Sequence, residues 1–530
     1  MHFLKNITFL ILCLPMMSLA NYAPLNAQCD GLPKLPIGSI EGTCLGLVAS
    51  DFNGVKFIKP RKAIELAQSH QLLITDMGGW TSGKGVLWLL QFESSGYKKL
   101  ISHKKIATKL AMPHDIKLHS DGYIYLGEAH QISRFKIEDN SITQYEVIVS
   151  NLPAPSSEYL HPLTSFVFLN NNDLLINVGS KTDSCGLLKG KINCNEKNDV
   201  GLRLYRFKQN NTWAHNFSMY ATGLRNSVAL LVHTSGTILQ GENSSDIKDA
   251  AEPYEEINQV KQGGDYGWPY CLNRQFDYAS IHNPNIKNSC QHANYIEPYS
   301  LMPPHVAPLD MIYYHANRLP MLTGKLIMSW HGYRVVGNRV VAYDIDNNGL
   351  PMLSNTKHIQ YTQDPIAPAT QFTQHGFQPK GGSTHDAQHK EVVSHWNTVP
   401  ERRPEGAPVG LLELSDGAIL IVDDKNKAIL RLSNGAAYQD QAVNHTKINI
   451  SGYDFSGDAK ELLIEQCSQC HTELTSQPGL LLNSQTGWLK RIENKTLLEI
   501  KLTNKSGYMP PTGKLNSTDI QLILKHIINQ

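Results

Sequence analysis

The stretch LRNSVALLVHTSGTILQGENSS, from Leu224 to Ser245, contains two short apolar runs separated by a polar turn. Ser235 and Gly236 form the turn, and glycine at such a position favours a tight β-hairpin. The runs on either side are rich in valine, leucine and isoleucine, which is typical of strands. We therefore predict a hairpin whose first strand follows the polar pair Arg225 and Asn226.

The same pattern recurs along the chain: a polar or basic residue, an apolar strand, a turn and a second apolar strand. Its six copies begin at Pro60, Pro113, His161, Leu224, His305 and Gly406. Repeated hairpins with further strands between them are typical of propeller blades. We therefore expect a mainly β fold, a six-bladed β-propeller over residues 21–434. A β-sandwich pair with a chance likeness between its hairpins is the alternative.

The polar residues that open the repeats define a candidate site. In a propeller, the innermost strands all begin at one central mouth. The residues that should meet there, although distant in sequence, are Arg61, His114, His161 and Arg225.

The N-terminus has the features of an export signal. Lys5 precedes an apolar run, and Ser18 and Ala20 form a small-x-small cleavage site, so residues 1–20 are predicted to be a signal peptide. An uncleaved membrane anchor is the alternative, although the run is short for a span. We expect no membrane span in the mature chain and a periplasmic or secreted location.

The cysteines support an oxidising compartment. Of nine cysteines, Cys13 leaves with the signal and two belong to a C-x-x-C-H motif, which leaves six. These six lie in three close pairs, for which we predict disulfides: Cys29 with Cys44, Cys185 with Cys194 and Cys271 with Cys290. The formal net charge is only +1, and the absence of a long basic run makes nucleic acid an improbable partner.

The C-x-x-C-H motif is CSQCHTEL, which begins at Cys467. Cys467 and Cys470 would form the thioethers to haem c, and His471 would bind the iron. Met509, held in SGYMPPTG before two prolines, is the expected second axial ligand. Residues 458–530 resemble a small all-α class I cytochrome c, after a linker over 435–457. A zinc site or a thiol redox pair is the alternative.

A histidine-rich segment covers residues 371–396. His385 and His389 could share a helix face and bind a metal, but the glycine and glutamine content favours a solvated insertion.

Two motifs carry a resemblance over roughly residues 50–434. GLRN, which contains Arg225, and the later EEINQVKQGGDYGWPYC together resemble the glucose/sorbosone dehydrogenase family. Members of that family are six-bladed propellers that use pyrroloquinoline quinone (PQQ) and calcium. The resemblance therefore implies a dehydrogenase that oxidises a sugar or a related polyol.

The resemblance also assigns roles to residues. His161 would be the base that removes the hydroxyl proton, as a neutral imidazole can. Arg225 would stabilise the reduced quinone oxygen beside Asn226, and Arg334 is a weaker match to a basic cofactor contact. The backbone carbonyls of Ser244 and Ser245 would bind calcium, a Lewis acid that prefers oxygen ligands. The alternatives are a structural histidine at 161 and an Arg–Asn pair that only satisfies backbone carbonyls.

Two positions depart from the family pattern. Ala407 stands where many members have a cofactor-binding arginine, for which Arg402 or Arg403 could compensate. Leu160 precedes His161, so a carboxylate that orients the base would have to come from elsewhere.

Together, these features predict an exported quinohaemoprotein. Two-electron oxidation of a sugar or polyol at PQQ would be followed by one-electron transfers to the tethered haem and on to a downstream cytochrome or oxidase. Three alternatives are a non-catalytic propeller that carries an electron-transfer cytochrome, a calcium-dependent lactonase-like propeller, and a propeller with a second haem.

Overall fold

The structure, a computed structural model, describes residues 22–435 with internal gaps. Its gaps are residues 151, 154–158, 187–193, 209–211, 247–252, 274–289, 291–293, 333–336, 355–385 and 397–405. The expected signal peptide, linker and cytochrome c domain therefore lie outside the described residues, as do Arg334, Cys467, Cys470, His471 and Met509. No helix in the described part of the chain is long and apolar enough to cross a membrane.

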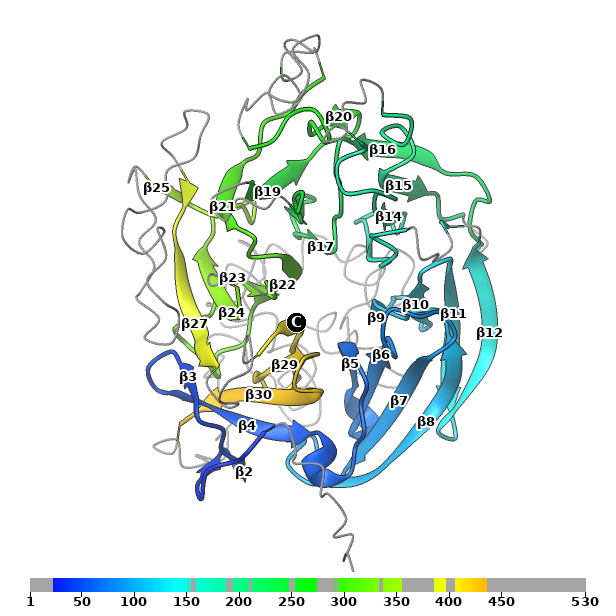
Figure 1. The fold of residues 1–530 in the computed structure, drawn as a ribbon. Coiled ribbons are helices and arrows are strands. Elements are labelled where there is room, and N and C mark those ends of the chain that lie inside the picture. Colours follow the sequence, from blue (N-terminus) through cyan, green and yellow to red (C-terminus); the bar gives the residue numbers. More distant parts are fainter. Residues whose placement is uncertain are drawn as a thin grey trace, which may run out of the picture.

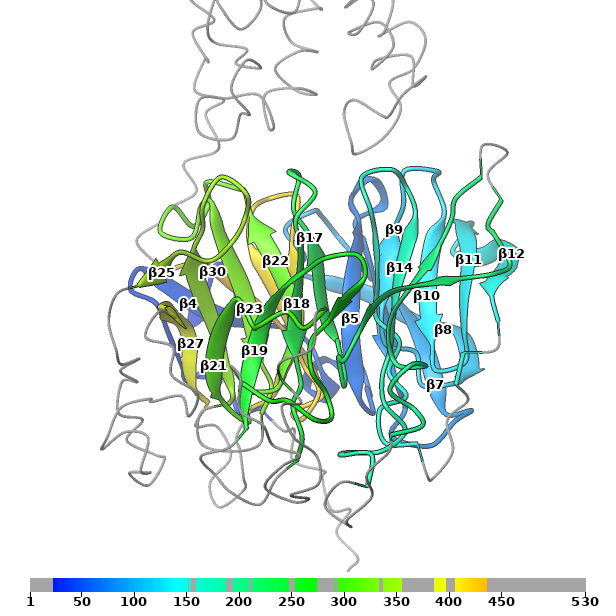
Figure 2. The ribbon, with the colours of Figure 1, turned by 90° about the horizontal axis from the view of Figure 1, so that it is seen from above.

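Six antiparallel sheets of at least four strands surround a common axis, so the prediction of a six-bladed β-propeller is confirmed (Figure 1). When the molecule is turned by 90°, the propeller is seen edge-on as a disc, and its strands run across the thickness of this disc (Figure 2). Each predicted hairpin supplies the two inner strands of one sheet. The alternative of two β-sandwiches is therefore wrong.

The first three blades follow the chain directly. Blade 1 contains β5 (Pro60–Leu66), β6 (Gln71–Asp76), β7 (Gly85–Phe92) and β8 (Leu100–Leu110). Blade 2 contains β9 (Ile116–Leu118), β10 (Ile124–Glu128), β11 (Gln131–Glu138) and β12 (Ser141–Val149). Blade 3 contains β13 (Phe166–Phe168), β14 (Leu174–Val178), β15 (Gly201–Tyr205), β16 (Ser218–Thr222) and, parallel to β16, the short β20 (Gly264–Asp265).

The last three blades include strands from elsewhere in the chain. Blade 4 contains β17 (Ala229–Val232), β18 (Ile238–Glu242), β19 (Tyr254–Val260) and β21 (Ser300–Pro304). Blade 5 contains β22 (Pro308–Tyr314), β23 (Lys325–Trp330), β24 (Arg339–Asp344), β27 (His389–Trp396) and β3 (Ile37–Ser39). Blade 6 contains β28 (Pro408–Glu413), β29 (Ile419–Asp423), β30 (Ala428–Asn434) and β4 (Thr43–Ala49).

Short elements lie outside the blades. They are β1 (Gln28–Cys29), β2 (Leu32–Pro33), β25 (Leu353–Ser354), β26 (Asp386–Ala387) and two 3₁₀ helices, η1 (Asp51–Asn53) and η2 (Ala67–Ser69). The histidine-rich segment ends in β27, so His389 belongs to a strand, not to a metal-binding helix; His385 lies outside the described residues.

The ring closes through an N-terminal strand. β4 pairs antiparallel with β30, so the outer strand of blade 6 comes from the opposite end of the propeller sequence (Figure 1). Arg431 of β30 is fully buried and pairs with Asp30, which precedes β4. The pairing of β4 with β30 completes the last blade with the N-terminal segment that leads into the first blade.

Apolar side chains fill the seams between blades. Ile64 and Leu73 of blade 1, for example, share one buried cluster with Ile124 of blade 2. Each fully buried aliphatic side chain of this kind contributes about 1.5–3 kcal/mol. The hydrophobic core is therefore a series of seams around the ring, and polar residues are left for its centre.

The three predicted disulfides are confirmed. They join Cys29 to Cys44, Cys185 to Cys194 and Cys271 to Cys290. The first connects β1 to β4, and the second closes the segment that follows β14.

Candidate functional site

The polar residues that open the repeats gather where the inner strands begin. Arg61 is the second residue of β5, and its Nε lies 3.1 Å from Nδ1 of His114, just before β9. His161 precedes β13, and Arg225 precedes β17 in the next blade. The Ser180 N–H donates to the Arg225 carbonyl at 2.8 Å, and Gly179 packs between His161 and Asn226, so His161 and the turn that contains Arg225 also lie close together.

His161 is held by the residues that follow β14. Its Nδ1 lies 2.7 Å from the Ser180 carbonyl and 2.8 Å from the Ser180 hydroxyl. Because a carbonyl can only accept, Nδ1 carries the proton and Nε2 is left as an acceptor. The sequence indicated that a carboxylate orienting the base would have to come from elsewhere; among the described residues the group that holds Nδ1 is Ser180, not a carboxylate.

The pKa of His161 lies well below its ordinary value. Burial penalises the charged imidazolium, and the Arg225 guanidinium lowers the pKa further, while the Ser180 carbonyl acts in the opposite direction. The imidazole is therefore neutral at neutral pH. A neutral imidazole with a free Nε2 can accept a proton.

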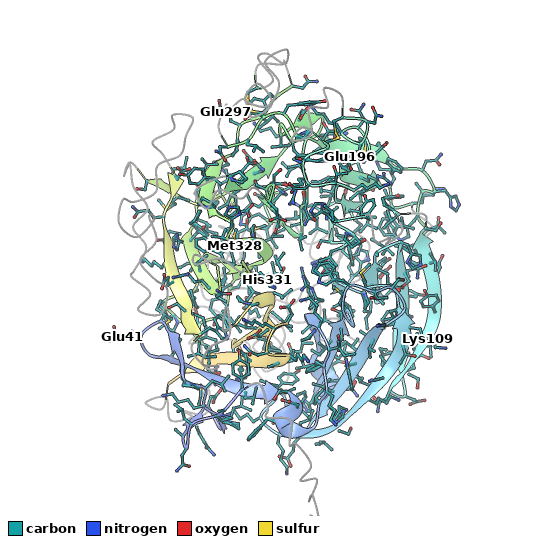
Figure 3. All side chains as sticks on the ribbon, viewed as in Figure 1. Glu41, Lys109, Glu196, Glu297, Met328 and His331 are labelled. Atoms are coloured by element: carbon teal, nitrogen blue, oxygen red, sulfur yellow. A yellow bond between two sulfur atoms is a disulfide. The ribbon has the colours of Figure 1, made fainter. Side chains whose placement is uncertain are left out.

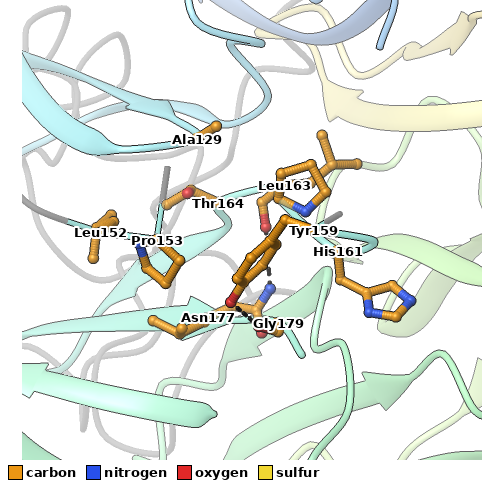
Figure 4. A pocket seen from close by; sticks show the side chains of 11 residues that line it. Ala129, Leu152, Pro153, Tyr159, His161, Leu163, Thr164, Asn177 and Gly179 are labelled. Atoms are coloured by element: carbon orange, nitrogen blue, oxygen red, sulfur yellow. Dashed lines mark hydrogen bonds between the residues drawn. The ribbon is translucent and has the colours of Figure 1, made fainter. Parts of the chain in front are cut away.

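A small, partly open pocket lies beside His161 (Figure 4). Tyr159 lines it and donates to the carbonyl of Gly179 at 2.6 Å. The His161 ring points away from Tyr159, so it does not fill this pocket. Gly179 is required here because a Cβ would lie 2.6 Å from the His161 carbonyl oxygen and 2.7 Å from its Cβ.

Arg225 is held from three directions. Its Nη2 donates to Asp183 Oδ1 at 2.5 Å, and its Nη1 donates to the Asn243 carbonyl at 2.7 Å. The backbone N–H groups of Arg225 and Asn226 both donate to one oxygen of Glu242, at 2.8 and 2.9 Å. The GLRN turn is thus fixed to the end of β18 by a buried carboxylate.

Buried carboxylates lie behind the segment that contains Ser244 and Ser245. Burial raises the pKa of Glu242 to about 7 and that of Glu255 to about 8, and it raises the pKa of Glu256 well above its usual range. Glu255 accepts from the Ser244 N–H at 2.5 Å. These groups are oxygen ligands of the kind that calcium prefers, and a divalent cation would offset the charge of the buried carboxylates.

A second polar cluster surrounds Asp424, which follows β29. Its carboxylate lies 2.8 Å from Lys59 Nζ, 2.5 Å from Arg61 Nη1 and 3.1 Å from His331 Nε2. Burial alone would raise the pKa of Asp424, but these three partners hold it well below its usual range. His331 lies near the centre of the ring (Figure 3).

The Asp424 cluster lies beside the position that departs from the family pattern. The N–H of Asp424 donates to the Ala407 carbonyl at 3.3 Å. Lys59 retains about a quarter of its side-chain exposure, so it offers positive charge near this position. Lys59 offers a cation to a cofactor with carboxylates, and the buried Asn226 side-chain oxygen, which has no hydrogen-bond partner among the described residues, can accept from an N–H or O–H group of such a cofactor.

Sequence reasoning did not find Ser180, Asp183 or Asp424. Ser180 and Asp424 follow the second strands of their repeats within two residues, and Asp183 lies three residues after Ser180. The position shared by Ser180 and Asp424 could have indicated these two.

Comparison with known proteins supports the fold and the repeat assignment. Residues 118–352 match the family model described as Glucose / Sorbosone dehydrogenase. The matched segment covers less than half of the chain. It includes the GLRN turn, His161 and both strands that carry the buried glutamates.

Two solved structures share the fold. A calcium structure of a Trichoderma reesei carbohydrate-active enzyme of family AA12 has a TM-score of 0.56 and 17% identity, and the match covers 78% of this chain and 99% of that one. The holo form of the PQQ domain of a pyranose dehydrogenase from Coprinopsis cinerea has a TM-score of 0.55 and 18% identity, over 76% of this chain and 99% of that one.

One curated relative is an uncharacterized protein of Borreliella burgdorferi. It is 23% identical over 269 residues, which is 49% of this chain. The chain spans only 57% of the length of that relative.

Proposed function

We propose that this protein is a PQQ-dependent dehydrogenase that oxidises a hydroxyl of a sugar or polyol and passes the electrons to a haem c on its own C-terminal segment. The observation that carries the proposal is the position of His161: Ser180 holds its Nδ1, Nε2 has no hydrogen-bond partner among the described residues, and the ring lies next to the turn that contains the buried Arg225. An alcohol oxidation needs both a proton acceptor and a cation that stabilises the reduced acceptor.

In this proposal each residue has a defined task. PQQ, when bound, would accept the hydride from the substrate carbon. His161 would take the hydroxyl proton, and Arg225 would stabilise negative charge at the quinone, with Asn226 beside it. The family match and the PQQ-containing fold relative from Coprinopsis cinerea support this assignment.

Calcium would bind beside the quinone. The carbonyls of Ser244 and Ser245 are the proposed ligands, and the buried carboxylates Glu242 and Glu255 supply the compensating charge. The role of calcium would be to polarise the quinone oxygen. Arg334 stays a proposed cofactor contact, supported by the family resemblance alone.

The haem segment completes the electron path. Cys467 and Cys470 would attach haem c, and His471 and Met509 would bind the iron. Tethering raises the effective concentration of the acceptor, so two successive one-electron transfers need no second protein. The predicted export signal and the three disulfides support a periplasmic or secreted location.

The test is reconstitution of the full chain, loaded with haem, with PQQ and calcium. A panel of aldoses and polyols is added while the haem absorbance is followed. Reduction by at least one sugar is expected, and only when both PQQ and calcium are present. A folded, loaded protein whose haem is reduced by no substrate contradicts the proposal, and turnover of lactones without haem reduction would favour the lactonase-like alternative.

The variant His161→Ala tests whether His161 is the base that accepts the hydroxyl proton. The rate of haem reduction should fall by about 10²–10⁴-fold, while PQQ affinity stays within a few-fold of wild type. Activity near that of the wild type would remove His161 from this role.

A further inference from the structure

One short segment contacts both His161 and Arg225. The chain leaves β14 at Val178, and Ser180 accepts from His161 Nδ1. Three residues later, Asp183 accepts from Arg225 Nη2 at 2.5 Å. His161 lies at the start of blade 3 and Arg225 at the start of blade 4. Residues 180–183 contact both side chains, so this segment connects the two blades at the site.

Asp183 is the centre of the contacts around Arg225. Its Oδ1 accepts from Arg225 Nη2 and from the Asp246 N–H at 2.8 Å. Its carbonyl accepts from Arg225 Nε at 3.2 Å, from the Ser245 hydroxyl at 3.3 Å and from Trp268 Nε1 at 3.1 Å. A single residue therefore ties the guanidinium to the 244–246 segment and to the loop that contains Trp268.

The contact between Asp183 and Arg225 is a largely buried ion pair. The Arg225 side chain is 4% exposed, and Asp183 is its nearest anion; Asp246 lies 3.6 Å away and is 63% exposed. A buried guanidinium that loses its paired carboxylate is strongly destabilised. Without Asp183, Arg225 should therefore rotate toward water and leave its place beside His161.

Further contacts hold residues 181, 182 and 185 of this segment. Glu196 accepts from the Lys181 N–H at 2.7 Å, from the Thr182 N–H at 3.3 Å and from the Thr182 hydroxyl. The disulfide between Cys185 and Cys194 closes the same loop. These contacts fix the backbone at residues that belong to no strand.

We propose that residues 180–185 form a positioning bracket, in which Asp183 holds the Arg225 guanidinium beside His161 and the Cys185–Cys194 disulfide keeps the bracket in place. The inference rests on the proposed function, because it assigns positioning residues to the same site. Asp183 touches neither base nor substrate in this proposal and acts through Arg225.

The first test needs neither PQQ nor substrate. In full-length protein with labelled histidine, the His161 resonance is assigned with His161→Gln and titrated by NMR. Arg225 is the charged group that lowers the pKa of His161, so Asp183→Ala should move this pKa upward by about 0.5 or more as the guanidinium departs. An unchanged or lower pKa shows that Arg225 has stayed in place and overturns the bracket.

The matched control is Asp173→Ala. Asp173 is also a carboxylate of blade 3 that is paired with an arginine, Arg206 at 2.6 Å, but it lies in the turn at the opposite end of β14. This variant should lose stability without any change in the His161 titration. If Asp173→Ala shifts the His161 pKa as much as Asp183→Ala does, the shift comes from a general loss of stability and the inference is overturned.

The second test measures the affinity for PQQ by fluorescence titration of the calcium-loaded protein. Asp183→Ala should weaken binding about tenfold or more, and Asp183→Asn, which keeps an oxygen acceptor, should restore part of the loss. Equal affinity in the wild type and Asp183→Ala would contradict the bracket. A wild type that binds no PQQ overturns the proposed function, whereas the His161 titration still decides on the bracket.

The disulfide is tested with the double variant Cys185→Ser/Cys194→Ser. It should move the His161 pKa in the same direction as Asp183→Ala, by a smaller amount. The control is Cys29→Ser/Cys44→Ser, which removes a disulfide at the ring closure and should leave His161 unchanged. If both pairs, or neither, shift the titration, the disulfide has no specific part in the bracket and that part of the proposal is wrong.

Discussion

At the scale of single residues, His161 illustrates how local contacts set chemistry. The Ser180 carbonyl fixes the tautomer, while burial and Arg225 keep the ring neutral. Neither effect is a property of histidine itself. Each arises because the third and fourth blades bring these groups together.

The pH dependence of activity follows from this arrangement. Since the pKa of His161 is lowered, the ring stays a neutral base as the pH falls below 6.5, the ordinary value for histidine. We expect kcat/KM for sugar oxidation to be level through pH 6.5 and to decline only in more acidic solution. Measured pH–rate profiles test this. Ser180→Ala should leave the decline in place because it keeps the carbonyl, and an acid limb centred at or above pH 6.5 would contradict the assignment.

At the scale of elements, a glycine controls how closely two blades approach. A Cβ on Gly179 would lie 2.6 Å from the His161 carbonyl oxygen and 3.1 Å from Asn226 Oδ1. The end of β14 therefore contacts the base of its own blade and the GLRN turn of the next. This close approach places residues 161 and 225 around one centre.

Gly179→Ala should harm both stability and activity. Added volume at this tight contact is expected to lower the free energy of unfolding by about 1–3 kcal/mol, and displacement of His161 should reduce kcat more than stability alone explains. Chemical denaturation and steady-state kinetics check the two effects. Gly96→Ala is the control, because a Cβ there would contact only the Lys98 side chain, at 3.4 Å or more. If Gly179→Ala and Gly96→Ala lose the same stability and activity, the close contact at Gly179 is not the cause of the loss.

A partly buried histidine of β27 makes blade 5 sensitive to acid. Burial lowers the pKa of His389 to about 4, and the centroid of its ring lies 4.5 Å from that of the Trp330 ring. The unfolded chain binds the proton near pH 6.5, before the folded chain does. Stability is therefore retained above pH 6.5 and lost as the pH falls toward 4, by at most about 3 kcal/mol for this group.

His389→Phe tests this directly. The variant should flatten the decline of the unfolding free energy between pH 6.5 and 4, measured by urea denaturation at a series of pH values. His215→Gln, at an exposed position, should keep the wild-type decline. An unaltered slope in His389→Phe would assign the acid sensitivity to other groups.

At the scale of the whole molecule, stability depends on how the ring is closed. Asp30, from the N-terminal segment, contacts Lys98 of blade 1, Arg318 of blade 5 and Arg431 of blade 6. The cations hold the pKa of Asp30 below its usual value although burial acts in the opposite direction. One carboxylate therefore joins three parts of the propeller at the seam where β4 meets β30.

Asp30→Asn should weaken closure of the ring. Arg431 is fully buried and keeps Asp416 as a second partner at 2.5 Å, so loss of the Asp30 charge should lower the free energy of unfolding by about 1–3 kcal/mol. Thermal and urea denaturation measure the effect. The surface pair of Lys99 and Glu93 is the comparison, because both side chains are more than half exposed and Glu93→Gln should cost less than about 1 kcal/mol. Similar losses in both variants would show that Asp30 has no special role.

The amino-acid sequence alone determined the six hairpins, the propeller and the three disulfides. Hydrophobic alternation, turn residues and cysteine spacing are local, so they can be recognised without knowledge of distant contacts. It also indicated that Arg61, His114, His161 and Arg225 would face one centre, because the repeat fixes where each inner strand begins.

Only the tertiary structure decided which groups contact one another at that centre. Arg61 pairs with Asp424, 363 positions away, and Ser180, not a carboxylate, orients His161. No local pattern specifies such pairs. They depend on ring closure and on the close approach of neighbouring blades, and these follow from packing of the complete chain.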